Sequence, residues 1–176
     1  MHTDTSQRTG LSGVSPGGPD HRRLRRSLGQ FATGVTVVTY ELDGAARGIT
    51  VNSFTSVSMD PPLVLVSLAL TSKAAQALDR SGFVVNILAA EQEAVAKQFC
   101  GTSADSPAAQ WETDCRIPRL AGTVAWIECE PHTRTNAGDH VLVLGRVVDH
   151  LTYDRDALVF QSGRYRSLPP EPGSGD

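Results

Sequence analysis

The sequence predicts a mainly β protein, an antiparallel β-barrel with a few short helices. Apolar runs of strand length recur along most of the chain, and short segments rich in Gly, Pro, Asp and Ser separate them. One run, 141–148, is apolar on both faces apart from Gly145 and Arg146, which indicates a central strand covered on both sides. Many strands joined mostly by hairpins are typical of an antiparallel barrel.

The size and charge of the chain limit its organisation. The 176 residues suit one domain with a full core, and the net charge of −3 gives no reason to expect nucleic acid. No apolar run approaches the roughly 20 residues of a membrane span, and the N-terminus lacks the apolar core of a secretion signal, so we expect a cytoplasmic protein. Residues 1–20 and 169–176 should be disordered tails around a single domain of residues 21–168.

The first helix is expected to begin after Asp20, which can cap it, and to run to about Ala32. Its apolar stripe consists of residues at spacings of four and three: Leu24, Leu28 and Phe31. The four arginines between Arg22 and Arg26 suggest a phosphate-binding patch, although the acidic charge of the whole chain favours a solvated helix face.

The remaining elements follow from turns and caps. Asp43-Gly44 is a typical hairpin turn after a strand over 35–40, and the prolines of Met59-Asp60-Pro61-Pro62 cannot donate ladder bonds, so pairing should stop there. Ser72 can cap a short helix over 74–80, and helical spacing recurs over 91–99. The other strands are expected over 49–54, 63–69, 83–88, 124–130, 141–150 and 157–161, with a polar loop over 101–115.

The cysteines Cys100, Cys115 and Cys129 are odd in number and form no Cys-x-x-Cys pair. This pattern fits a reducing compartment and predicts neither a disulfide framework nor a zinc site. We expect each of them to be a small buried hydrophobic residue. The histidines show no metal-ligand spacing either, so no metal is expected.

The segment 47–70 is the clearest sign of function. It joins two apolar runs through small hydroxyl and amide residues, which can bring backbone N–H groups up to a flat polar ring such as a flavin. Four further segments accompany it: FATGVTVVT (31–39), FVVNIL (83–88), AGDHVLVLGRV (137–147) and SGRY (162–165). In their order and approximate spacing, over about residues 22–168, the chain resembles the flavin reductase family that supplies reduced flavin to two-component monooxygenases.

This resemblance implies a fold, a reaction and partners. The fold is the antiparallel FMN-binding split β-barrel of the Greek-key type, as a homodimer with each flavin site near the subunit boundary. The activity is that of an NAD(P)H:flavin oxidoreductase, in which hydride passes directly from NADH, or less favourably NADPH, to FMN or FAD without a catalytic side chain. A flavin-dependent monooxygenase would receive the reduced flavin.

The residues expected to bind flavin lie at the end of a strand, at the bend that follows it and at a helix start. They are Thr50, Val51, Asn52, Ser53, Ser56, Val57, Ser58, Ser67, Leu68, Ser72 and Lys73. Backbone donors at the bend would stabilise the negative charge that builds on the ring during reduction. At the helix start, free N–H groups, the Ser72 hydroxyl and the Lys73 ammonium group converge, which suggests a phosphate site. Simple helix capping, with Lys73 in solvent, is the alternative.

For NADH, the resemblance points to His140 in Gly138-Asp139-His140 and to Tyr165 in Gly163-Arg164-Tyr165. A neutral imidazole can stack on or hydrogen-bond to the nicotinamide nucleotide, and an aromatic ring near the barrel mouth can cover the flavin or the nicotinamide. Each has an ordinary alternative: His140 as a structural residue at a strand start, and Tyr165 as a dimer-packing residue.

Three rival functions remain open at this point. The same barrel could hold flavin or heme without turnover, as a carrier or sensor. It could be an oxidase like the pyridoxamine phosphate oxidases, which need basic residues around a substrate phosphate, and no clear set of these is present. It could also be a plain interaction module, which predicts no flavin binding.

Overall fold

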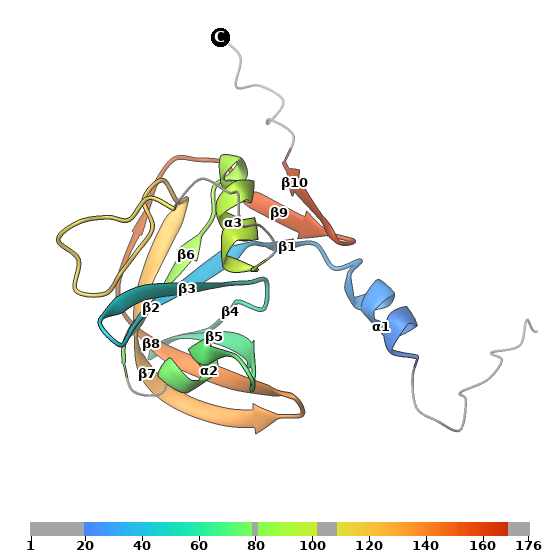
Figure 1. The fold of residues 1–176 in the computed structure, drawn as a ribbon, viewed down its shortest axis with the longest axis horizontal. Helices are drawn as coiled ribbons and strands as arrows, with labels where there is room; N and C mark the ends of the chain where they lie inside the picture. The colour runs from blue at the N-terminus through green and yellow to red at the C-terminus, as the bar shows by residue number, and fades with distance from the viewer. Residues whose placement is uncertain (1–19, 79–80, 102–108, 169–176) are drawn as a thin grey trace, which may run out of the picture.

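A computed structural model describes residues 20–78, 81–101 and 109–168. These residues form antiparallel sheets with a few short helices, which confirms the predicted mainly β class (Figure 1). The tails predicted for 1–20 and 169–176 lie outside the described residues, apart from Asp20.

The helical elements are α1 (His21–Leu28), α2 (Lys73–Ala77), the short 3-10 turn η1 (Ala90–Gln92) and α3 (Glu93–Phe99). The strands are β1 (Thr33–Gly34), β2 (Thr36–Leu42), β3 (Ala45–Val51), β4 (Thr55–Met59), β5 (Pro62–Ala69), β6 (Phe83–Ile87), β7 (Ala125–Ala137), β8 (His140–Thr152), β9 (Leu158–Gln161) and β10 (Arg164–Ser167).

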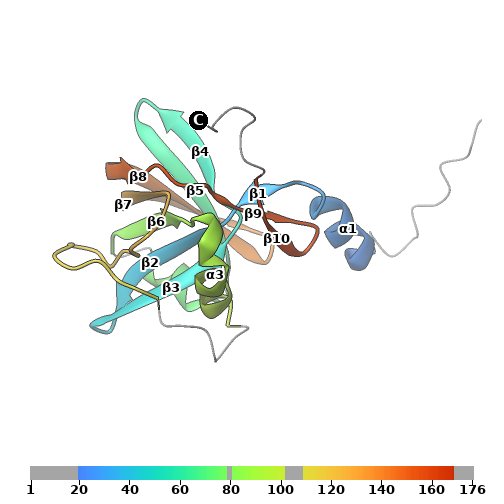
Figure 2. The same ribbon diagram turned by 90° about the horizontal axis from the view of Figure 1, so that it is seen from above.

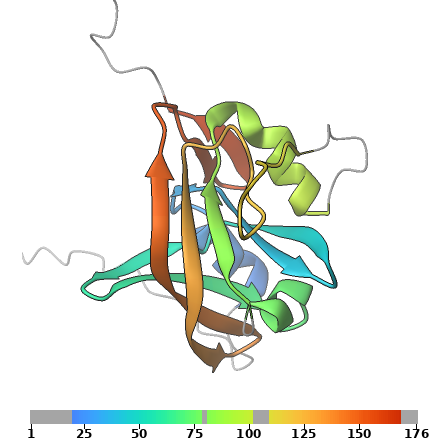
Figure 3. The same ribbon diagram turned by 90° about the vertical axis from the view of Figure 1, so that its left-hand side faces the viewer.

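The larger sheet has seven strands in the order β3-β2-β6-β7-β8-β5-β4, and it curls into the barrel wall. A second sheet of three strands, β1-β9-β10, lies with α3 at one end of the barrel, while α2 lies towards the other end (Figures 1 and 3). The β4–β5 hairpin extends away from the barrel body (Figure 2). The strand β8 is central, between β7 and β5, as its apolar run predicted.

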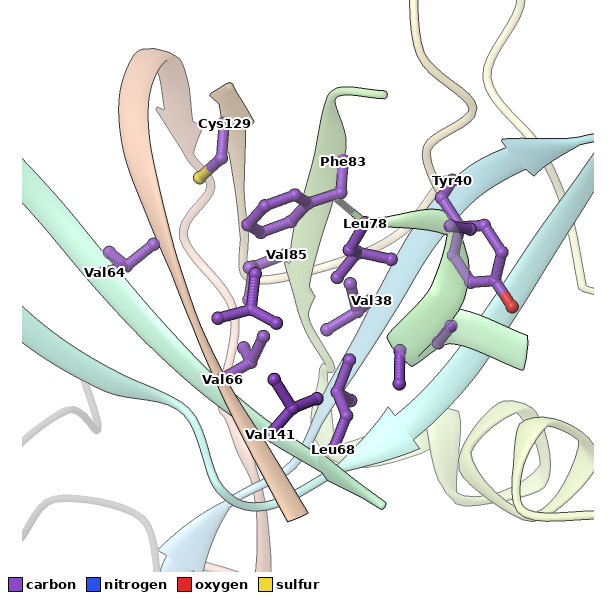
Figure 4. Close-up of a cluster of buried hydrophobic side chains, with 14 residues drawn as sticks. Val38, Tyr40, Val64, Val66, Leu68, Leu78, Phe83, Val85, Cys129 and Val141 are labelled. Atoms are coloured by element: carbon purple, nitrogen blue, oxygen red, sulfur yellow. The ribbon is translucent and has the colours of Figure 1, made fainter. Parts of the chain in front are cut away.

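The barrel interior is filled by branched aliphatic side chains around one phenylalanine (Figure 4). Phe83 is fully buried, and Val38, Val66 and Val141 belong to the same cluster. Gly145 interrupts the apolar run of β8 because a Cβ there would lie only 2.5 Å from Phe83 Cζ. A larger side chain at this position would displace the ring and strain the packed core.

Three local signals are confirmed by the structure. Asp20 caps α1 by accepting a hydrogen bond from the Arg22 N–H at 2.9 Å, and Ser72 caps α2 by accepting one from the Ala75 N–H at 3.1 Å. Asp43 and Gly44 both have positive φ, which a two-residue hairpin between β2 and β3 requires.

Several boundaries were predicted wrongly. α1 ends at Leu28 instead of Ala32, because the chain leaves the helix at Gly29. The strand expected over 49–54 ends at Val51, and the separate strand β4 follows it before the proline turn. Strand β7 continues well past residue 130, and β10 was not predicted at all.

The burial of β8 and of the cysteines differs from what the sequence predicted. The second face of β8 is only half-buried at Leu142 and Leu144, so that strand is not covered on both sides within the described chain. Cys129 is buried, and its burial raises the pKa of its thiol to about 12, but Cys100 is exposed and Cys115 is half-buried. Among the described residues, no helix is long and apolar enough to cross a membrane.

Candidate functional site

Two adjoining grooves lie where β3 ends. The first, which we call the ring groove, has a volume of about 220 Å³ and is lined by Val35, Thr50, Val51, Asn52, Cys100, Phe160 and Tyr165. The second, the helix groove, has a volume of about 670 Å³ and is lined by Ser27, Leu28, Gly29, Phe31, Thr33, Asn52, Ser53, Phe54, Thr55 and Phe160. Asn52 and Phe160 line both grooves, so the two grooves adjoin at these two residues.

Hydrogen bonds fix the chain where it leaves β3. The Thr50 hydroxyl donates to the Ala96 carbonyl of α3 at 2.8 Å, and the Thr36 hydroxyl donates to the Val51 carbonyl at 3.0 Å. The Ser53 hydroxyl donates to the Ser67 carbonyl at 2.8 Å and accepts from the Ser67 N–H at 3.1 Å. These bonds hold the strand end and the bend as a rigid wall, which limits how the wall can shift when a ligand binds.

Two aromatic rings form the facing side of the ring groove. Phe160 of β9 and Tyr165 of β10 are paired in register, with ring centroids 5.2 Å apart and tilted planes. Burial, followed by the nearby Cys100 thiol, raises the pKa of Tyr165 to about 12. The tyrosine is therefore a neutral ring at physiological pH, and its hydroxyl lies 3.9 Å from Cys100 Sγ. It suits stacking and covering rather than proton transfer.

The ring groove has the composition that a flat heteroaromatic ring requires. Val35, Val51 and Phe160 give it apolar walls, and Thr50 and Asn52 bring main-chain and side-chain polar groups to one edge. Ligand pockets of this kind combine apolar walls with a few fixed polar groups. These residues therefore fit an isoalloxazine ring.

The structure brings only some of the predicted flavin residues together. Thr50, Val51 and Asn52 lie in the ring groove, and Ser53 lies in the helix groove. Ser56 and Ser58 line a different hollow of about 300 Å³, with the exposed Val57 between them at a β-bulge.

The expected phosphate residues are more dispersed. The Leu68 side chain is buried in the barrel core, so only its main chain is available to a ligand, and Ser67 is engaged with Ser53. Ser72 caps α2. Lys73 lines a separate hollow of about 580 Å³ together with Arg134, whose guanidinium donates to the Ala75 carbonyl at 2.7 Å.

His140 begins β8 and pairs in register with Ala69 at the end of β5. It lines neither groove, and its side chain is half-exposed. Its Nδ1 lies 2.7 Å from the Asp139 carboxylate, and this hydrogen bond is the main reason that the pKa of Asp139 is lowered. Because an ionised carboxylate can only accept, Nδ1 carries the proton in this contact.

Comparison with known proteins identifies the family. The family model described as "Flavin reductase like domain" matches residues 28–169. The chain belongs to this family. The protein named FMN reductase (NADH) SmoA of Agrobacterium fabrum is 39% identical over 152 residues, covering 85% of this chain and 87% of that protein. The NADH-dependent FAD reductase of Streptomyces globisporus is 38% identical over 165 residues, covering 89% and 90%.

Solved structures of flavin reductases share the fold. The native state of flavin reductase PheA2 superposes with a TM-score of 0.82 at 39% identity, covering 86% of this chain and 99% of that one. The Streptomyces globisporus NADH:FAD oxidoreductase SgcE6, solved with NAD and FAD fragments, gives 0.80 at 38% identity, covering 91% and 98%.

Three parts of this candidate site were not predicted from the sequence: Phe160, Cys100 and the end of α1. Phe160 could have been found, because the Ser162-Gly163 turn signals a hairpin that pairs it with Tyr165. Cys100 was set aside as a buried residue. The end of α1 is brought to the groove by tertiary contacts, since the Ser162 N–H donates to the Gly29 carbonyl at 2.7 Å. No sequence pattern predicts that hydrogen bond.

Proposed function

We propose that this protein is an NADH-dependent flavin reductase that passes hydride from NADH to FMN or FAD. One observation supports this most directly: the ring groove joins the 50–52 strand end to the Phe160–Tyr165 wall, which gives apolar walls beside a polar strand end. Hydride transfer between a nicotinamide and a flavin needs such a surface and no side-chain acid or base, because the cofactors carry the chemistry. Relatives named as an FMN reductase and an FAD reductase that use NADH support the same function.

The chain's own residues would bind, orient and shield the reacting rings. Val35 and Val51 would contact one face of the ring, while the main chain near Thr50 and Asn52 would hold its polar edge. Phe160 and Tyr165 would exclude water from the groove and keep two rings in contact at roughly 3–3.5 Å. Such contacts favour moderate affinity, which lets the reduced flavin leave.

We infer that the reduced flavin is delivered to a flavin-dependent monooxygenase. The relatives include proteins named as reductase components of such systems, among them the reductase subunit HsaB of Rhodococcus jostii. Free cysteines and a need for NADH fit a cytoplasmic setting, and we take residues 21–168 to be the single folding domain.

An anaerobic assay tests the activity. The purified protein is mixed with NADH and, in turn, FMN, FAD and riboflavin, and absorbance reports both the oxidation of NADH and the bleaching of the flavin. We expect both signals with at least one flavin. Protein that stays yellow and never oxidises NADH would support the carrier or sensor alternative instead.

We also propose that the protein is a homodimer. The extended β4–β5 hairpin exposes Val57 and Met59, the latter with 89% of its surface in solvent, and β8 exposes Val148 and Leu151. Met59 and Leu151 line the same hollow, and apolar surface gathered in this way is typical of subunit contacts. Sedimentation equilibrium should give twice the monomer mass; a monomer at micromolar concentration would contradict this proposal.

Replacing His140 with alanine is expected to raise the KM for NADH about 10-fold, the effect of losing one good hydrogen bond to a charged ligand. Flavin affinity should change much less, because His140 lies outside the ring groove. Steady-state kinetics and flavin titration measure the two effects. His132→Ala, at an exposed position of β7, is the matched control. Equal losses for NADH and flavin would remove His140 from this role.

Replacing Lys73 with alanine is expected to weaken FMN and FAD binding about 10-fold, because a charged contact with the phosphate is lost. Riboflavin has no phosphate, so its affinity should stay nearly unchanged. Fluorescence titration with the three flavins provides the measurement. The phosphate assignment would be wrong if riboflavin lost as much affinity as FMN.

A further inference from the structure

The helix α1 carries four arginines that make no ion-pair contact within the described part of the chain. No ion pair described there involves Arg22, Arg23, Arg25 or Arg26. The helix projects from the barrel beside β9 and β10, and none of its residues is buried (Figure 1). Unpaired arginines at the edge of a large groove attract anions.

Ser27 and Leu28 are the residues of α1 that line the helix groove. Arg25 precedes Leu28 by three residues and Arg23 precedes Ser27 by four, so these two arginines flank the groove side of α1. Arg26 precedes Leu28 by two residues and lies about 200° around the helix, on the other side. Arg25 and Arg26 both belong to the last turn, where each interacts favourably with the helix dipole. A difference between their substitutions would therefore not come from the helix dipole.

The Arg25 side also lies towards the turn that carries His140. The pKa of Asp139 is lowered first by its hydrogen bond with His140, and the charge of Arg25 lowers it further. Asp139 is already bonded to His140, at 2.7 Å. The charge of Arg25 therefore acts on the turn that carries His140, while Leu28, on the same face of α1, lines the helix groove.

We propose that Arg25 binds the diphosphate of the nicotinamide dinucleotide, which lies along the helix groove while its nicotinamide enters the ring groove. This proposal rests on the proposed function. Arginine matches phosphate oxygens with paired N–H donors. The groove, at about 670 Å³, is large enough for more of a dinucleotide than the ring alone. The flavin phosphate is assigned elsewhere, because Lys73 lines a separate hollow.

The test compares Arg25→Gln with Arg26→Gln, which removes the same charge from the same helix turn. Two hydride donors are used with riboflavin as acceptor: NADH, and the neutral 1-benzyl-1,4-dihydronicotinamide, which has no phosphate. We expect Arg25→Gln to raise the KM for NADH about 10-fold, to flatten its dependence on ionic strength, and to leave kinetics with the neutral donor unchanged. Arg26→Gln should stay within about twofold of the parent protein with both donors.

Other outcomes overturn the proposal in distinguishable ways. If both substitutions raise the KM for NADH equally, the helix acts only as a diffuse positive surface. If Arg25→Gln weakens FAD but not riboflavin and leaves NADH unchanged, the contact belongs to the flavin diphosphate. If Arg25→Gln slows the neutral donor as much as NADH, its role is structural. A parent protein that oxidises neither donor would contradict the proposed function itself.

Discussion

Replacing Asn86 with alanine is expected to lower the free energy of unfolding by about 3–5 kcal/mol, since each buried group left unpaired costs 1–3 kcal/mol and a cavity adds to the loss. Asn86 is fully buried in β6. Its amide donates to the Val37 carbonyl and to the Thr39 hydroxyl, both at 2.9 Å, and its carbonyl oxygen accepts from the Leu120 N–H at 2.9 Å. One side chain thus joins β6, β2 and the segment before β7.

Urea denaturation of both proteins measures this loss. Asn136→Ala, at an exposed position of β7, is the matched control and should change the free energy by no more than about 0.5 kcal/mol. A loss below about 1 kcal/mol at Asn86 would mean that water or a shifted main chain replaces these bonds. That result would contradict the role assigned to the asparagine of the FVVNIL segment.

Signals confined to neighbouring residues predicted the fold best. The Asp43-Gly44 turn and the Ser72 cap are each determined by a few adjacent residues, and the structure confirms both. The strand β4 was not predicted because its Ser and Thr content is typical of a loop. Its extended conformation comes from pairing with β5. The end of α1 was misplaced because the apolar spacing continues to Phe31, although the chain turns away at Gly29.

The candidate site shows the same difference between residues predicted by local sequence and residues brought in by distant contacts. Thr50, Val51 and Asn52 are consecutive, so one segment predicted them as a group, and the structure places them in one groove. Lys73 was predicted from its place at a helix start and His140 through resemblance, and neither lines that groove. Their roles stay predictions. Phe160 joins the site from more than a hundred residues away. The Ser162-Gly163 turn predicts its pairing with Tyr165, but no local pattern predicts the pairing of β9 with β1.

Replacing Phe160 with alanine is expected to lower kcat/KM for flavin reduction about 100-fold, the effect of displacing reacting groups by roughly 1 Å. Phe160 lines both the ring groove and the helix groove, and it packs against Tyr165 with ring centroids 5.2 Å apart. Without it, Tyr165 loses its neighbour and the two grooves merge, so a flavin and a nicotinamide are no longer held face to face.

A matched aromatic control separates this positioning effect from a general loss of stability. Trp111 also contacts another ring, Phe99, at 6.0 Å, and it lines a hollow that shares no residue with either groove. Trp111→Ala should therefore destabilise the fold without lowering kcat/KM at a temperature where both variants remain folded. Single-turnover reduction of bound flavin by NADH measures the difference directly. If Phe160→Ala and Trp111→Ala lower kcat/KM equally, Phe160 contributes only to the stability of the fold. The alignment of flavin and nicotinamide would then not depend on its ring.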